Sequence, residues 1–320
     1  MSAIVCVGSA VLDRVYTVSN LPERDGGAFV TDYSERAGGV AANVACALAT
    51  LDHDVTVISR VGRDDAADVI VESLATHGVT SAIERGDGDS SYTLVLRGPD
   101  GDRMIVAGGD SIPQLRLSDR DCARCREADC VFTSAYAPEP VVERLIELRE
   151  RGEIETLVFD LAGPLAELQG RGTGVETIDA VAQCADCFVT NEVAARSYLD
   201  QSPAEAVRTI RASGADRVAV TCGADGAYLA GTGMDPVHVP AVDRDIVDTT
   251  GAGDQFTAVL IHAWVLDGVA PATAGRMAAV AASTSSETTS SPPGMVPVSS
   301  RGVKTTSVSR RPYRGGVSSV

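Results

Sequence analysis

The chain has 320 residues, of which 44% are apolar and 22% charged, and its formal net charge is −17. This length and apolar content suffice to bury the core of one large α/β domain. The negative charge disfavours nucleic acids and anionic membranes as partners, because both carry negative charge themselves. No apolar run approaches the ~18 residues needed to span a bilayer, and no basic region precedes the first apolar stretch, so we expect a cytoplasmic protein.

Almost all basic residues are arginines, and Lys304 is the only lysine in the chain. A P-loop, the third strand of a protein kinase and a Schiff-base enzyme each require a lysine, which excludes these classes over residues 1–303. Phosphate chemistry here must therefore rely on backbone amides, arginines and a metal ion. An acidic chain with arginine in place of lysine also suggests a salt-loving host.

Eight cysteines occur without a secretory context, so we expect free thiols rather than disulfides. Two Cys-x-x-Cys pairs, Cys122/Cys125 and Cys184/Cys187, have a spacing that suits a tetrahedral zinc site. Each pair lies in a helix-like stretch that runs into an apolar strand, where small buried thiols explain the pattern equally well. We favour buried thiols.

Apolar strand-like runs alternate with amphipathic helix-like runs along most of the chain. The expected strands cover residues 4–8, 55–59, 131–134, 156–160, 187–190 and 218–221. The expected helices cover residues 41–51, 66–77, 140–151, 204–212 and 253–266. This alternation predicts a mostly parallel sheet flanked by helices, which binds its ligands at the carboxyl ends of the strands.

Two segments, 14–37 and 90–109, interrupt the alternation with short runs of alternating polarity. In the second, the turn 98–102 contains Gly, Pro and Asp and predicts a hairpin. We expect these segments to form a small antiparallel sheet, acting as a lid or as the surface of a homodimer. Arg103 on this hairpin is a candidate substrate contact, although an exposed strand arginine is the simpler interpretation.

Residues 283–320 differ in composition from the rest of the chain. They are rich in Ser, Thr, Pro and Gly, and they hold five basic residues against the single acid Glu287. This change indicates a low-complexity, disordered tail or a segment altered by a shift in the reading frame. The expected folded body is residues 1–282.

The strongest chemical signal is the glycine-rich run 247–258, which reads Val-Asp-Thr-Thr-Gly-Ala-Gly-Asp-Gln-Phe-Thr-Ala and leads into an apolar helix. Glycines let backbone amides face an anion, and the N-terminus of a helix adds a favourable dipole. Asp254 on this turn can take the proton from an attacking hydroxyl during phosphoryl transfer. A helix-capping aspartate is the alternative, but the complete run favours catalysis.

This run resembles the second signature of the ribokinase (PfkB) family of carbohydrate and nucleoside kinases, Asp-Thr-x-Gly-Ala-Gly-Asp. Residues 38–45, Gly-Gly-Val-Ala-Ala-Asn-Val-Ala, resemble the first signature of that family. Residues 4–13 look like its first strand and substrate-binding aspartate, and residues 220–227 look like its nucleotide-side strand and turn. The resemblance covers residues 3–282 and implies a ribokinase-like α/β fold with a small β lid.

The resemblance also implies roles for individual residues. The residues that would bind sugar hydroxyls are Asp13, Gly39 and Asn43. Those that would form the catalytic centre are Gly251, Ala252 and Gly253, whose amides provide an anion hole, and Asp254, the general base. The residues that would border the ATP phosphates and ribose are Thr221, Gly223 and Gly226.

Two departures from the family pattern concern its cofactors. The family's Asn-x-x-Glu, linked to magnesium and phosphate, reads Asn191-Glu-Val-Ala194 here, so Glu192 becomes the candidate Mg²⁺ ligand, acting through water. The ketohexokinase branch has a similarly altered motif. The segment after residue 282, which in the family helps close the adenine and monovalent-cation region, is atypical here, and K⁺ remains a candidate cofactor.

Together these features predict an ATP-dependent carbohydrate kinase for a ribose- or ketohexose-like sugar. A nucleoside kinase of the same family and a non-catalytic or tail-damaged ligand-binding relative are the alternatives. A Rossmann dehydrogenase is excluded, because Gly8-Ser-Ala-Val-Leu lacks the Gly-x-Gly-x-x-Gly that cradles a pyrophosphate.

Overall fold

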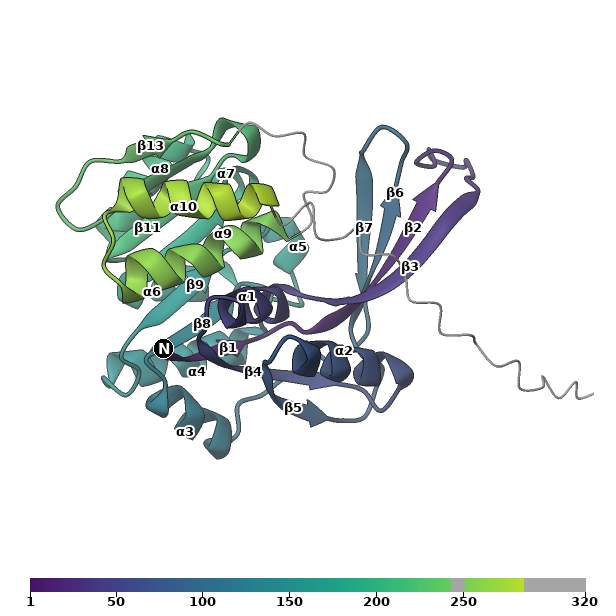
Figure 1. Cartoon of the computed structure of the whole chain (residues 1–320), viewed down its shortest axis with the longest axis horizontal. Helices are drawn as coiled ribbons and strands as arrows, with labels where there is room; N and C mark the ends of the chain where they lie inside the picture. Colours follow the sequence, from purple (N-terminus) through teal and green to yellow (C-terminus); the bar gives the residue numbers. More distant parts are fainter. Residues whose placement is uncertain (243–250, 285–320) are drawn as a thin grey trace, which may run out of the picture. The chain divides into compact units, whose positions relative to one another are not determined.

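The structure is a computed structural model that describes residues 1–242 and 251–284. The larger sheet of the described residues has the strand order β13-β12-β11-β10-β9-β8-β1-β4-β5 (Figure 1). Its parallel strands are β1 (Ala3–Val7), β4 (Asp54–Val61), β5 (Thr80–Arg85), β8 (Cys130–Ser134), β9 (Leu157–Asp160), β10 (Cys187–Asn191) and β11 (Arg217–Thr221). Two antiparallel strands, β12 (Ala227–Ala230) and β13 (Val237–Val239), extend one edge. All six strands expected from the sequence are present, and the predicted α/β fold is confirmed.

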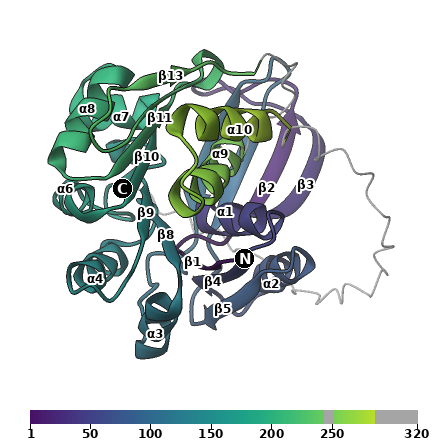
Figure 2. The same ribbon diagram turned by 60° about the vertical axis from the view of Figure 1, so that its left-hand side comes forward.

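Helices cover both faces of this sheet (Figures 1 and 2). One face carries α1 (Val40–Ala49), α2 (Asp65–Thr76), α9 (Ala252–Leu260) and α10 (Pro271–Thr284). The other carries α3 (Asp119–Glu127), α4 (Glu139–Glu150), α6 (Val175–Cys184), α7 (Glu192–Leu199) and α8 (Pro203–Ser213). The short helix α5 (Leu165–Leu168) lies between β9 and α6 in the chain.

The predicted helix 253–266 is not α-helical throughout. After α9 the chain continues as a π-helix, η2 (Ile261–Leu266), and the amide of Asp267 donates to the carbonyl of His262, five residues back, at 3.1 Å. The widened turn places His262 against His53, with Nδ1 and Nε2 3.1 Å apart. Hydrophobic periodicity does not predict a side-chain contact between residues so far apart in sequence.

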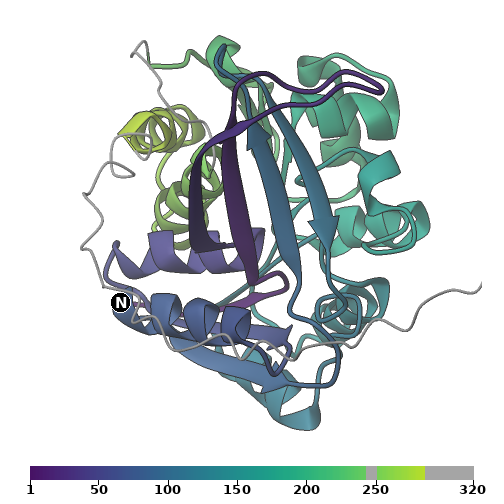
Figure 3. The ribbon, with the colours of Figure 1, turned by 90° about the vertical axis from the view of Figure 1, so that its right-hand side faces the viewer.

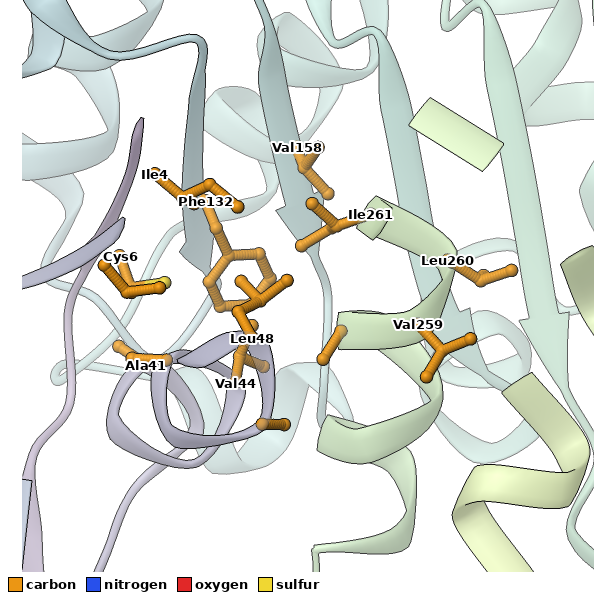
Figure 4. Close-up of a cluster of buried hydrophobic side chains, with 14 of the residues drawn as sticks. Ile4, Cys6, Ala41, Val44, Leu48, Phe132, Val158, Val259, Leu260 and Ile261 are labelled. Carbon is orange, nitrogen blue, oxygen red and sulfur yellow. The ribbon is translucent and has the colours of Figure 1, made fainter. Parts of the chain in front are cut away.

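One hydrophobic core joins α1 and α9 to the same face of the sheet (Figure 4). The buried side chains that Figure 4 labels are Ile4, Cys6, Ala41, Val44, Leu48, Phe132, Val158, Val259, Leu260 and Ile261. Burial of such side chains contributes about 1.5–3 kcal/mol each. The packing fixes the two helices side by side, so residues in their first turns, 211 positions apart in sequence, can meet.

The second sheet has four strands in the order β3-β2-β6-β7 (Figure 3). They are β2 (Val11–Val18), β3 (Val30–Gly38), β6 (Tyr92–Arg97) and β7 (Arg103–Gly108), and the predicted turn closes with Gly98 N donating to Asp102 O at 2.9 Å. The sheet is antiparallel as predicted except for the parallel central pair β2–β6. Both central strands enter the lid from the main sheet, after β1 and β5, and therefore run in the same direction.

All eight cysteines are free, and Cys122 and Cys125 on α3 are buried. Burial raises the pKa of Cys125 and Cys187 to about 12, which favours the thiol over the thiolate that zinc requires. The described residues hold no cluster of three or more His, Cys, Asp or Glu side chains arranged for a metal ion.

Within residues 1–242 and 251–284, none of the helices combines the length and apolar character needed to cross a membrane. The predicted tail lies outside the described residues from position 285 onward, as do Asp248, Thr249 and Thr250 of the glycine-rich run.

Candidate active site

Gly38 and Gly39 connect the lid to α1, since β3 ends at Gly38 and α1 begins at Val40. Gly39 has φ 97°, and a Cβ there would lie 2.6 Å from the carbonyl oxygen of Ser9. A Cβ on Gly38 would collide with the carboxylate of Asp13. Both positions therefore require glycine, because the backbone approaches its neighbours too closely for a side chain.

Asp13 lies on β2 with its side chain directed at the same junction. Its Oδ1 accepts a hydrogen bond from Thr93 Oγ1 at 2.5 Å, and Arg36 Nε lies 4.0 Å from Oδ2. Burial raises the pKa of Asp13, while the Thr93 hydroxyl and the Arg36 charge oppose the rise. The carboxylate is thus held in place by the lid and is available to accept from a ligand.

A cavity of about 510 Å³ separates the lid from the main sheet, and its volume lies within the usual range for small-molecule sites. Asp13 and Gly39 line it, as predicted for substrate-binding residues. Lining residues that the sequence analysis did not identify include Ser9, Thr93, Tyr136, Glu167 and Arg171. Arg171 Nη1 and Nη2 donate to the carbonyls of Ala107 and Gly109 on the lid, at 3.1 and 2.8 Å.

Asn43 and Asp254 form the central contact of the site. Asn43 lies in the first turn of α1 and donates from Nδ2 to Asp254 Oδ2, in the first turn of α9, at 2.7 Å. Burial raises the pKa of Asp254 to about 7, the charges of Asp160 and Asp13 add to the rise, and the Asn43 hydrogen bond opposes it. A carboxylate with this pKa is suited to proton transfer at neutral pH.

The glycine-rich turn begins α9 next to Asp254. Gly251 is the N-cap residue with φ 82°, a left-handed conformation that favours glycine. Apart from the glycines' own neighbours in the chain and the backbone of α9, no described residue lies within 4 Å of a Cβ built on Gly251 or Gly253. The N-terminus of α9, which includes Ala252, supplies the backbone amides and the helix dipole that favour an anion.

The predicted nucleotide-side residues lie at the end of β11 and in the turn that follows. Thr221 is the last residue of β11, while Gly223 and Gly226 have φ 54° and 88°. A Cβ on Gly226 would collide with the carbonyl oxygen of Val239 on β13. Gly226 is therefore required by the geometry of the turn, in addition to its predicted role in binding ATP.

Glu192, the predicted metal ligand, is the first residue of α7, and its Oε1 accepts from Arg196 Nη2 at 2.6 Å. Asn191 caps the same helix by accepting from Ala194 N at 2.8 Å, and its Nδ2 donates to Ala162 O at 2.6 Å. The Glu192 side chain is 35% exposed. A partly exposed carboxylate can bind Mg²⁺ through water, the mode in which this ion keeps its hydration shell.

Asp160 was not identified from the sequence as a site residue, although it ends a predicted strand at the edge where ligands bind, a signal that could have found it. Arg171 lies in a loop without a recognisable pattern, and no sequence signal indicates its contact with the lid. Arg103, weighed as a substrate contact, lies exposed at the start of β7.

The fold and the candidate site suit a kinase that phosphorylates a small molecule. The family described as pfkB family carbohydrate kinase matches residues 1–295. An ATP-dependent ribose-1-phosphate kinase of Halopiger xanaduensis is 31% identical over 274 residues, covering 84% of this chain and 86% of that relative. A deoxyribokinase of Salmonella typhimurium is 27% identical, covering 83% and 86%.

Solved structures agree on the fold. Ribokinase from Thermotoga maritima has a TM-score of 0.75 and 22% identity, covering 89% of this chain and 93% of that one. Arabidopsis thaliana ribokinase complexed with ribose and ATP has a TM-score of 0.75 and 23% identity, with the same coverage. The chain belongs to the PfkB family of carbohydrate kinases, and it is an ATP-dependent sugar or nucleoside kinase of the ribokinase type.

Proposed function

We propose that the protein transfers the γ-phosphoryl group of ATP to a hydroxyl of a ribose-like sugar, with Asp254 as the general base. The observation that carries this proposal is the Asn43–Asp254 hydrogen bond, which orients a carboxylate whose pKa is about 7. Asp13, electrostatically coupled to Asp254, lines the adjacent cavity and supplies an acceptor for sugar hydroxyls.

In this reaction the sugar oxygen attacks the γ-phosphorus, its proton passes to Asp254, and the bond from phosphorus to the leaving oxygen of ADP breaks. The amides of Gly251, Ala252 and Gly253 stabilise the charge on the transferred group through hydrogen bonds and the helix dipole. Mg²⁺, when bound, would neutralise phosphate charge, and Glu192 would hold it through water.

A second candidate substrate is ribose 1-phosphate. Arg171 lines the cavity, and it donates to the neutral carbonyls of Ala107 and Gly109, so its positive charge is available to an anionic substituent. A relative named as a ribose-1-phosphate kinase is 31% identical to this chain. A charge-assisted hydrogen bond contributes about 1.5–3 kcal/mol, or roughly 10- to 100-fold in kcat/KM.

The function is tested by ADP release from Mg-ATP in concentrated KCl, since the acidic composition suits such a medium. The acceptors are ribose, ribose 1-phosphate, fructose, fructose 1-phosphate, 2-keto-3-deoxygluconate and nucleosides. We expect turnover of a ribose-based sugar, with ribose 1-phosphate preferred if Arg171 binds the phosphate. Preference for a nucleoside would instead support the nucleoside kinase. A folded protein, verified by its thermal unfolding, that releases no ADP with any acceptor would contradict kinase activity.

We also propose that the lid mediates a homodimer. Its edge strands β3 and β7 expose apolar side chains, namely Val30 (56%), Tyr33 (46%), Met104 (46%), Ile105 (54%) and Val106 (58%). Exposed apolar edge strands are protected by pairing with another chain. We expect sedimentation velocity to show a dimer that Val106→Glu dissociates, while Val69→Glu on α2 leaves it intact. A monomeric unmodified protein would contradict this proposal.

A further inference from the structure

We infer that Asp160 is a positioning residue for the proposed reaction: its buried negative charge, against the face of α9 that carries Thr257, makes Asp254 a stronger base. This inference rests on the proposed function of Asp254. Asp160 lies outside both family signatures, and it has no role in the steps of the reaction proposed above.

The geometry places Asp160 under the catalytic helix. It is the last residue of β9, in the interior of the large sheet, and is 7% exposed. Its Oδ1 accepts from Ala162 N at 2.8 Å, and its Oδ2 lies 3.5 Å from Thr257 Oγ1. Thr257 is 1% exposed and follows Asp254 by three residues on α9, so the two lie on the same side of the helix.

The hydrogen-bonding partners of Asp160 are an amide and a hydroxyl, and neither carries a charge that would neutralise it. Burial raises the pKa of Asp160 to about 7, and the hydrogen bonds from Ala162 and Thr257 oppose the rise. Among the causes that raise the pKa of Asp254, burial is the largest and the charge of Asp160 is the second. The Asn43 hydrogen bond acts in the opposite direction. Two like charges in a site of low polarity hinder the ionisation of each other.

The other titratable groups coupled to this pair come from three neighbouring elements. Asp13 on β2 carries a further negative charge that acts on Asp254. Tyr136, after β8, donates to Glu167 Oε2 at 2.8 Å, and its raised pKa keeps the phenol neutral. Burial raises the pKa of Cys187 on β10 to about 12, so that thiol is neutral too. Among the described residues, the charged neighbours that raise the pKa of Asp254 are thus both carboxylates, Asp160 and Asp13.

The consequence for catalysis follows from the match between base strength and working pH. A carboxylate with an ordinary pKa near 4 is a weak acceptor for a hydroxyl proton, whereas one near 7 accepts it more readily while still being ionised in a large fraction of molecules. Asp160 therefore acts on the reaction through Asp254 and does not need to touch the substrate.

The test is a ¹³C NMR titration of aspartate side chains in the full-length protein, which needs no turnover. The Asp254 signal is assigned by its absence in Asp254→Asn. We expect Asp160→Asn to lower the Asp254 titration midpoint by about one pH unit, because a like charge is removed. The matched control Asp235→Asn, in an exposed loop, should leave the midpoint unchanged.

The dependence of kcat on pH, measured with whichever acceptor turns over, should show the same change. In Asp160→Asn, the midpoint of the acid limb should shift to lower pH by the same amount as the Asp254 titration midpoint. If Asp160→Asn lowers the melting temperature but leaves the Asp254 midpoint in place, Asp160 is only structural and the inference is wrong. Absence of turnover from the unmodified protein would overturn the proposed function, while the NMR midpoint would still decide the coupling.

Discussion

Asp254→Asn is expected to lower turnover by roughly two to four orders of magnitude, the usual contribution of a general base. Asparagine has nearly the same shape and can still meet Asn43 across α1 and α9, but it cannot accept the hydroxyl proton. ADP release at saturating Mg-ATP and sugar measures the loss. The KM for either substrate should change little, because the residue acts on the proton that moves during the reaction.

The control for this substitution is Asp267→Asn, at the far end of the same helical stretch, where the side chain is 56% exposed. We expect its turnover to remain within about twofold of the unmodified enzyme, as for most surface substitutions. Turnover of Asp254→Asn close to that of the control would remove Asp254 from the mechanism.

The raised pKa of Asp254 also predicts how stability depends on pH. Between the ordinary carboxylate pKa and about 7, the folded protein holds a proton on Asp254 that the unfolded chain has lost. The contribution of this group to stability is therefore present at low pH and is lost as the pH rises towards 7. At pH 8, where the carboxylate is ionised and poorly solvated, Asp254→Asn should raise the melting temperature while it abolishes activity.

Asp13→Asn is expected to raise the KM for the sugar by roughly 10- to 100-fold, the loss of one charge-assisted hydrogen bond. Thr93 and Arg36 hold the Asp13 carboxylate at the cavity, so the substitution removes a prepositioned acceptor. The KM for ATP should be unaffected, because the predicted nucleotide-side residues lie at the end of β11 in the nine-stranded sheet, whereas Asp13 lies on β2 of the four-stranded sheet.

Initial-rate kinetics with both substrates varied distinguish these effects. Asp32→Asn, on the exposed part of β3, is the matched control, since it changes the charge of the lid without altering the cavity lining. An equal rise in the KM for sugar in both variants would show that lid charge, and not contact with Asp13, determines affinity.

The fold was largely predictable, because strand and helix periodicities alternate clearly and the two glycine signatures have specific spacings. The candidate site was predicted where residues match a motif of the family, as Asp13, Asn43 and Asp254 do. Asn43 was predicted to contact the sugar, and the structure adds a hydrogen bond from its amide to Asp254, a partner 211 positions away that the packing of α1 against α9 brings near. The position of Arg171 at the cavity depends on how the α5–α6 loop meets the lid, and no local sequence pattern indicates that contact.

The parallel pairing of β2 with β6 was missed for a related reason. Alternating polarity predicts that a segment forms a strand, but strand direction depends on where the chain leaves the main sheet. Strand direction is therefore a property of the connections between elements, and the alternation of polarity within a strand does not encode it.

The π-helix after α9 bears on how the family can vary in sequence. A π-turn accommodates one residue more than an α-turn of the same rise, so it can absorb an insertion without changing the helix on either side. Here the π-helix follows Val259 and Leu260 and begins at Ile261, and all three side chains are packed in the core. This packing fixes the turns of α9 that precede the π-helix. Insertions or deletions at residues 261–266 would thus rearrange the His53–His262 contact at one end of the helix and leave the position of Asp254 unchanged.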